Sequence, residues 1–184
     1  MKRFFQKRIA MATIGFALLF IAGGFYLPGG VELCVTPMSG DRPLLVLPLE
    51  EGEHFTIHYY HSVENAPIWE VHSTDRSGRI YIEEEIYLKF GAGMGKMPGV
   101  GRMVTRGPYE AIEGMHMPIG TFILRIGSPG VDHTVIWRGI RTNLSSMAPH
   151  AAAMFSAKPV SWLYRSWRNF FPHTATPLSR ESEQ

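Results

Sequence analysis

His54-Phe55-Thr56-Ile57-His58-Tyr59-Tyr60-His61 decides the fold class, because apolar and polar side chains alternate along it with a period of two. Such alternation is typical of a β-strand with one face on a hydrophobic core. The predicted core face carries Phe55, Ile57, Tyr59 and His61, and the other face carries His54, Thr56, His58 and Tyr60. The stretch therefore predicts a half-buried strand that ends in a histidine.

Outward from this strand the chain continues as short extended runs separated by glycine and proline. Further strands are expected near residues 31–35, 44–49, 68–74, 79–90, 103–105, 109–116, 121–126 and 133–140. The 19 glycines and 13 prolines favour turns over long helices, and the single cysteine excludes an intrachain disulfide framework. We predict an all-β domain over residues 31–142, an antiparallel β-sandwich or partly open barrel.

The first thirty residues have a different pattern. Lys2, Arg3, Lys7 and Arg8 precede an uncharged run over residues 9–27, which a proline and two glycines end. As a helix this run would measure about 28 Å, enough for a bilayer core. We expect residues 1–30 to be a transmembrane signal anchor or, as the alternative, a cleaved signal peptide. Either function keeps the N-terminus in the cytoplasm and exports the β-domain.

The charge distribution argues against nucleic-acid binding. The formal net charge is +2, but residues 1–30 hold four basic residues and no acid. The remainder has 14 basic and 16 acidic residues. The apparent basicity is therefore mainly an orientation signal for membrane insertion.

Residues 143–173 are expected to form a helical extension, with a disordered tail over residues 174–184. Val160, Leu163, Tyr164, Trp167 and Phe170 recur at the spacing of one helical face, between two prolines. Such a basic amphipathic helix has three possible roles: packing on the β-domain, lying on a membrane surface or docking a partner. The membrane-surface alternative assigns that contact to Trp162, Arg165, Trp167 and Arg168.

The densest polar cluster follows the quoted strand. A histidine at the inner end of a strand needs a hydrogen-bond partner or a ligand, and Ser62, Glu64 and Glu70 are close to His61 in sequence. One interpretation is a His–carboxylate pair that pins a hairpin, and the other is a small polar pocket. Metal binding is not expected, although His54, His58, His61, His72 and Glu70 are ligand types, because His54 and His58 lie on the opposite strand face.

Two further features are a run of three glutamates and the glycine-rich segment that follows it. Alternation places Glu84 among inward isoleucines, and a β-bulge in the Glu83-Glu84-Glu85 triplet would instead turn it outward. Residues 90–99 are rich in glycine but lack the phosphate-loop spacing, so a loop at one end of the domain is expected. No nucleophile motif is present, and we expect neither enzymatic activity nor a cofactor.

Several of these residues resemble a bacterial family, domain of unknown function 1850. The resemblance rests on Tyr59, His61-Ser62-Val63-Glu64, Pro67, Glu70 and the later Phe90-Gly91-Ala92-Gly93. Members are small exported proteins, often encoded beside TRAP transporters of the TAXI type. The family's motif residues correspond here to Tyr59, His61, Ser62, Pro67, Glu70, Gly91 and Gly93. Together with Glu64 and Glu84 they form our candidate site for a ligand or a partner.

The resemblance implies an accessory role in solute uptake, through contact with the transporter permease, the solute-binding protein or both. We therefore expect a periplasmic domain on the bacterial inner membrane that acts by protein–protein contact. The alternative is a periplasmic protein that binds a small ligand or a metal through His61, Ser62 and Glu70, with Glu84 as a possible contributor.

Overall fold

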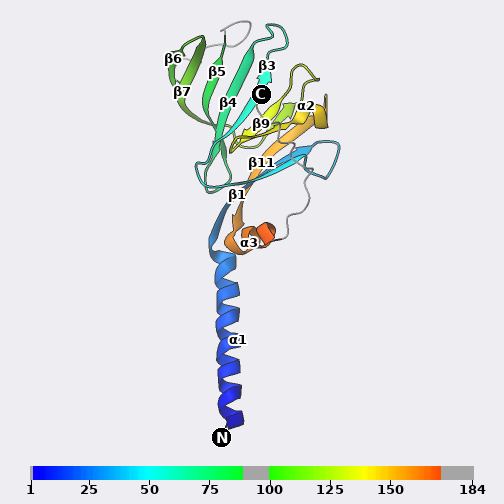
Figure 1. Ribbon diagram of the computed structural model, residues 1–184. Coiled ribbons are helices and arrows are strands. Elements are labelled where there is room, and N and C mark those ends of the chain that lie inside the picture. The colour runs from blue at the N-terminus through cyan, green and yellow to red at the C-terminus, as the bar shows by residue number, and fades with distance from the viewer. Residues whose placement is uncertain (1, 89–99, 171–184) are drawn as a thin grey trace.

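The computed structural model describes residues 2–88 and 100–170, whose strands form two antiparallel sheets (Figure 1). The smaller sheet has the order β2 (Leu45–Leu49), β1 (Pro28–Pro37), β11 (Ala152–Ser161) and β8 (Phe122–Arg125). The larger sheet has the order β10 (Ile140–Asn143), β9 (Thr134–Trp137), β3 (Phe55–Tyr60), β4 (Pro67–Thr74), β5 (Ile80–Tyr87), β7 (Tyr109–Pro118) and β6 (Arg102–Arg106). The all-β antiparallel class is confirmed as two sheets, and in the described residues neither closes into a barrel.

The hydrophobic core lies between the two sheets. Phe55 and Ile57 of β3 point into it as predicted, and they meet Leu33 of β1 and Phe155 of β11. All four are at most 1% exposed. Burial of each such side chain is worth about 1.5–3 kcal/mol, so the alternation along β3 fixes which face of the larger sheet is covered.

The predicted strands recur with small changes of boundary. One of them, over residues 133–140, is instead two strands, because the chain reverses at Arg138 and Gly139. Both residues have positive φ, 50° and 77°, as a two-residue hairpin turn requires. β9 and β10 are therefore the arms of one hairpin.

The prediction of a helical extension over residues 143–173 was wrong for its middle. Residues Leu144–Met147 form the short helix α2, but β11 follows and pairs with β1 and β8. Ala153 and Phe155 of β11 are fully buried at alternating positions. Pairing with two distant strands overrides the helix propensity of the alanines here, so the β-domain continues well past residue 142.

Two longer helices lie outside the sheets, and Figure 1 shows α1 (Lys2–Tyr26) projecting from the domain beside α3 (Trp162–Phe170). The predicted C-terminal helix is confirmed, although it begins at Trp162 and Val160 belongs to β11. In the part of the chain that the structure describes, no helix is long and apolar enough to cross a membrane. The transmembrane part of the N-terminal prediction therefore has no support, and residues 174–184 lie outside the description.

Strand register brings the family-like segments to one end of the larger sheet. Tyr60 at the end of β3 pairs with Pro67 at the start of β4. Ile68 pairs with Tyr87 at the end of β5, and Tyr87 pairs with Glu110 at the start of β7. The β3–β4 turn and the exit of β5 toward the glycine segment therefore share this end.

Candidate functional site

The turn between β3 and β4 is held by His61. Its backbone N–H donates to the Ala66 carbonyl at 2.8 Å, and its own carbonyl accepts from Asn65 at 2.8 Å. Its ring Nδ1 accepts the Glu64 N–H at 3.3 Å. His61 thus pins the hairpin by accepting a backbone amide, and within residues 2–88 and 100–170 no carboxylate pairs with its ring.

The same turn directs its middle residues outward. Ser62 is exposed, and the side chain of Val63 is 78% exposed. Asn65 adopts φ 48°, a left-handed conformation that asparagine tolerates better than most residues. The turn is therefore ordered by its own hydrogen bonds while presenting Ser62 and Val63 to solvent.

Tyr59 and Glu70, both predicted, meet on the inner side of the larger sheet. The Tyr59 hydroxyl donates to Glu70 Oε1 at 2.9 Å. Glu85 of β5 stands directly opposite Glu70 in the register, and the Tyr87 hydroxyl donates to it. We call Tyr59, Glu70, Glu85 and Tyr87 the inner carboxyl cluster.

Two carboxyl groups on adjacent strands disfavour full ionisation. Burial raises the pKa of Glu70, and the charge of Glu85 raises it further, against the opposing hydrogen bond from Tyr59. Burial also raises the pKa of both tyrosine hydroxyls, which remain donors. The cluster is therefore suited to hold a proton, or a ligand that donates hydrogen bonds.

Two buried histidines border the cluster. His72 Nδ1 donates to the Glu70 carbonyl at 3.0 Å, and its Nε2 lies 3.9 Å from Glu70 Oε2. Burial lowers the pKa of His72 to about 4, so its ring is neutral at pH 7. His133 stacks on Tyr59 with ring centroids 4.8 Å apart, and burial lowers its pKa as well. Neither ring supplies a positive charge to Glu70 at neutral pH.

Sequence analysis missed Glu85 and Tyr87 in this cluster, and it missed His133 at the border of the cluster. The side chain of Glu85 points inward only because β5 contains a bulge at Glu83, where the register shifts on both sides. The same bulge turns Glu84 outward, as the second interpretation predicted. The run of three glutamates indicated a bulge in the sequence. Which glutamate bulges decides which one lies opposite Glu70, and the sequence did not show that.

The outward Glu84 takes part in a surface ion-pair group rather than in the inner cluster. Arg106 Nη1 lies 2.7 Å from Glu84 Oε1, and Arg106 also pairs with Glu113. Arg102 bonds Glu113 at 3.1 Å. Because Glu84 lies on the outer face of the sheet, it does not belong with Glu70 in the predicted ligand set.

A separate hollow of about 360 Å³ opens at the opposite end of β4 and β5. Within its lining, the Ser73 hydroxyl donates to Glu83 at 2.6 Å, and His116 Nδ1 donates to the same carboxylate at 2.9 Å. His54 also lines it. Within residues 2–88 and 100–170, no group of three or more His, Cys, Asp or Glu side chains is placed to hold a metal ion.

The remaining predicted residues divide in two ways. Gly91 and Gly93 lie outside the described residues. In α3 the structure separates the four residues assigned together to a membrane surface: Arg165 and Arg168 bond to the β-domain, whereas Trp162 and Trp167 are 42% and 52% exposed. The arginines were therefore wrongly grouped with the tryptophans.

Comparison with known proteins gives one match. The family model described as Domain of unknown function (DUF1850) matches residues 55–144, a segment that contains every strand of the larger sheet together with β8 and ends at the first residue of α2. No curated protein and no solved structure matches the chain. The inner carboxyl cluster and the β3–β4 turn both lie within the matched segment, and this part of the chain is a DUF1850 domain.

Proposed function

We propose that the chain is an exported accessory protein of a TAXI-type TRAP uptake system, and that it acts by contact with the permease or the solute-binding protein. The transporter association comes from the family resemblance. The observation that carries the mode of action is the β3–β4 turn, which exposes Ser62 and Val63 on a hairpin pinned by His61. An exposed aliphatic side chain on a pre-ordered turn favours protein contact, since little conformational entropy is lost on binding.

Location at the inner membrane belongs to the same proposal. The uncharged run and its basic flank support export with the N-terminus in the cytoplasm. In α1, exposed apolar side chains such as Phe16, Leu19 and Phe20, each at least 70% exposed, support contact with lipid or with a membrane partner. The β-domain would then face the periplasm.

The experiment is co-purification of the tagged full-length chain with a co-expressed TAXI-type permease and solute-binding protein. Val63→Glu should abolish recovery of the partner, because it places a charge at the centre of the proposed contact. The matched control is Ile123→Glu on β8, since Ile123 is 59% exposed but lies on the smaller sheet. Equal recovery with both variants and wild type would contradict the proposal.

The inner carboxyl cluster favours a second candidate, the binding of a small ligand that donates hydrogen bonds. Tyr59 and Glu70 of the predicted ligand set remain in it, whereas Ser62 is exposed in the turn. A thermal-shift screen of organic amines and metal ions on the full-length chain tests it. A shift that Glu70→Gln removes would support ligand binding, and no response to any compound would count against it.

A further inference from the structure

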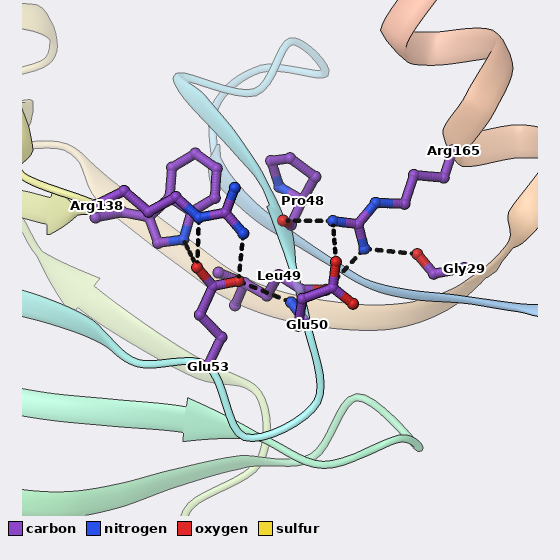
Figure 2. Close-up of polar contacts among 8 residues, drawn as sticks. Gly29, Pro48, Leu49, Glu50, Glu53, Arg138 and Arg165 are labelled. Atoms are coloured by element: carbon purple, nitrogen blue, oxygen red, sulfur yellow. Dashed lines mark hydrogen bonds and ion pairs between the residues drawn. The ribbon is translucent and has the colours of Figure 1, made fainter.

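The helix α3 is docked with its basic side against the protein. Arg165 Nη1 donates to the Gly29 carbonyl at 2.7 Å and to the Leu49 carbonyl at 3.3 Å, and its Nη2 lies 2.6 Å from Glu50 Oε1 (Figure 2). Its Nη2 also donates to the Pro48 carbonyl at 3.3 Å. Both Nη nitrogens of this guanidinium therefore bond to β1, to β2 and to the adjoining Glu50, and the side chain is only 18% exposed.

A second group fixes the same side of the helix. Glu32 of β1 is 6% exposed, and its Oε2 accepts from Arg168 at 2.9 Å and from the Tyr164 hydroxyl at 3.2 Å. Lys158 Nζ lies 3.4 Å from Glu32 Oε1. We call Glu32, Lys158, Tyr164 and Arg168 the clasp. Because Tyr164 and Arg168 of α3 bond to Glu32 of β1, this side of α3 is held toward the smaller sheet.

That rotation leaves an aromatic face outward. Trp162, Trp167 and Phe170 are 42%, 52% and 81% exposed. This is the reverse of an ordinary surface helix, whose apolar side is buried and whose charges meet water. The outward side of α3 is therefore suited to a medium that accepts aromatic rings.

The aromatic face continues onto the last turns of α1. Phe20 meets Trp162 edge to face with ring centroids 6.2 Å apart, and the backbone N–H of Trp162 donates to the Leu27 carbonyl at 2.8 Å. Phe25 and Tyr26 beside them are 62% and 90% exposed. We call the combined surface the aromatic collar, which consists of Phe20, Phe25, Tyr26, Leu27, Trp162, Trp167 and Phe170.

We propose that the aromatic collar lies in the headgroup region of a lipid bilayer. Tryptophan and tyrosine favour that region because each combines an apolar ring with a polar N–H or O–H group. The exposed apolar side chains continue from the collar along α1, and Figure 1 places the basic N-terminus at the far end of that helix. A protein partner would need to cover both helices, whereas a bilayer surface meets them together.

Lipid contact at the aromatic collar would also orient the β-domain relative to the membrane. Arg165 connects α3 to β1 and β2, and the clasp connects it to β1 and β11. Figure 1 shows the β3–β4 turn at the end of the larger sheet remote from α1. Lipid contact at the collar would therefore hold Ser62 and Val63 away from the membrane surface. The inference rests on the membrane location in the proposed function, but it needs only the end of α1 and α3 at the lipid surface.

The test uses the four tryptophans of the chain as depth probes. Single-tryptophan variants of the full-length chain, made by Trp→Phe substitution, are reconstituted in phosphatidylcholine–phosphatidylglycerol vesicles that contain no other protein. Lipids brominated close to the headgroup should quench Trp162 and Trp167 at least about twofold, as expected for rings at the interface. Trp69 and Trp137 of the β-domain are the matched controls and should keep their emission.

Flotation of the vesicles first establishes that each variant is incorporated. If Trp162 and Trp167 are no more quenched than Trp69 and Trp137 in floated samples, the collar does not contact lipid and the proposal is overturned. Equal quenching of all four would also overturn it, because the β-domain would then lie on the bilayer. Since no partner is present, this result is independent of the co-purification experiment with Val63→Glu.

Discussion

The clasp and the inner carboxyl cluster both remove a glutamate from water, and they do so in opposite ways. Glu32 in the clasp has Arg168 and Lys158 within 3.4 Å and accepts a tyrosine hydroxyl. Glu70 in the inner cluster also accepts a tyrosine hydroxyl, but its neighbour across the strands is Glu85. The first arrangement surrounds a carboxyl group with cations, and the second raises the pKa of Glu70.

This difference follows the boundary of the family match. The inner cluster lies within residues 55–144, whereas Glu32, Lys158 and Arg168 lie outside them. Charge pairing in the clasp serves to attach a helix to the domain. Two carboxyl groups opposite each other on adjacent strands stabilise a fold poorly, which is why we propose ligand or proton binding at the inner cluster.

The largest effect is expected from acid. Because the pKa of His72 in the folded chain is about 4, below its unfolded value, protonation favours the unfolded chain, and stability is lost as pH falls from 6.5 toward 4. The full loss is about 3 kcal/mol. His72→Phe keeps the stacking with Phe55 and Phe122 and should remove this acid sensitivity.

Urea unfolding of the full-length chain in mild detergent, from pH 7 to pH 4, measures that effect. His54→Gln is the matched control, because it replaces an exposed histidine next to the same strand. An identical loss of stability in wild type and His72→Phe would show that the inner side of the sheet is not the acid-sensitive region.

Breaking the clasp should have the next largest effect. Glu32→Gln leaves Arg168 and Lys158 without a counter-charge beside a buried amide, and should lower the free energy of unfolding by about 2 kcal/mol. The value lies below that of a fully buried pair because Lys158 is 62% exposed. Glu51→Gln, in an exposed pair with Arg76, should cost about 0.5 kcal/mol or less. If Glu32→Gln and Glu51→Gln lowered the free energy of unfolding equally, the clasp would have no special structural role.

Glu70→Gln should have a smaller effect of the opposite sign at alkaline pH. Since the folded-state pKa of Glu70 is raised, stability is present at low pH and is lost as pH rises above the ordinary glutamate value near 4.5. The variant should be about 0.5–1 kcal/mol more stable than wild type at pH 8, the size of a cross-strand like-charge repulsion. Tyr59→Phe should lose stability at pH 8, because it removes the donor to the ionised form. If urea titrations at pH 8 showed a loss of stability for Glu70→Gln and a gain for Tyr59→Phe, the described role of the inner carboxyl cluster would be contradicted.

The smallest effect is expected for the outward glutamate. Glu84→Gln weakens an ion pair with Arg106, which is 49% exposed, so the free energy of unfolding should change by about 0.5 kcal/mol or less. A loss comparable with that of Glu32→Gln would mean that pairing, rather than burial, determines the cost of these substitutions. The same urea titration at pH 7 provides the measurement.

The sequence by itself determined the all-β class, most strand positions and the inward face of β3. Phe55 and Ile57 alternate with polar residues, and this local period leaves one face that must be buried. The bulge that turns Glu84 outward was also visible, because three consecutive glutamates cannot all satisfy that alternation. These features depend on neighbouring residues alone.

Only the tertiary structure decided the identity of β11, the partners of Glu70 and the orientation of α3. Phe155 is in a strand because β1 and β8 flank it, although its own neighbours favour a helix. Strand register places Glu85 opposite Glu70. Arg165 points inward because its guanidinium donates hydrogen bonds to carbonyls of β1 and β2. Each outcome depends on residues distant in the chain, and the pairing of distant groups is not encoded in any local period.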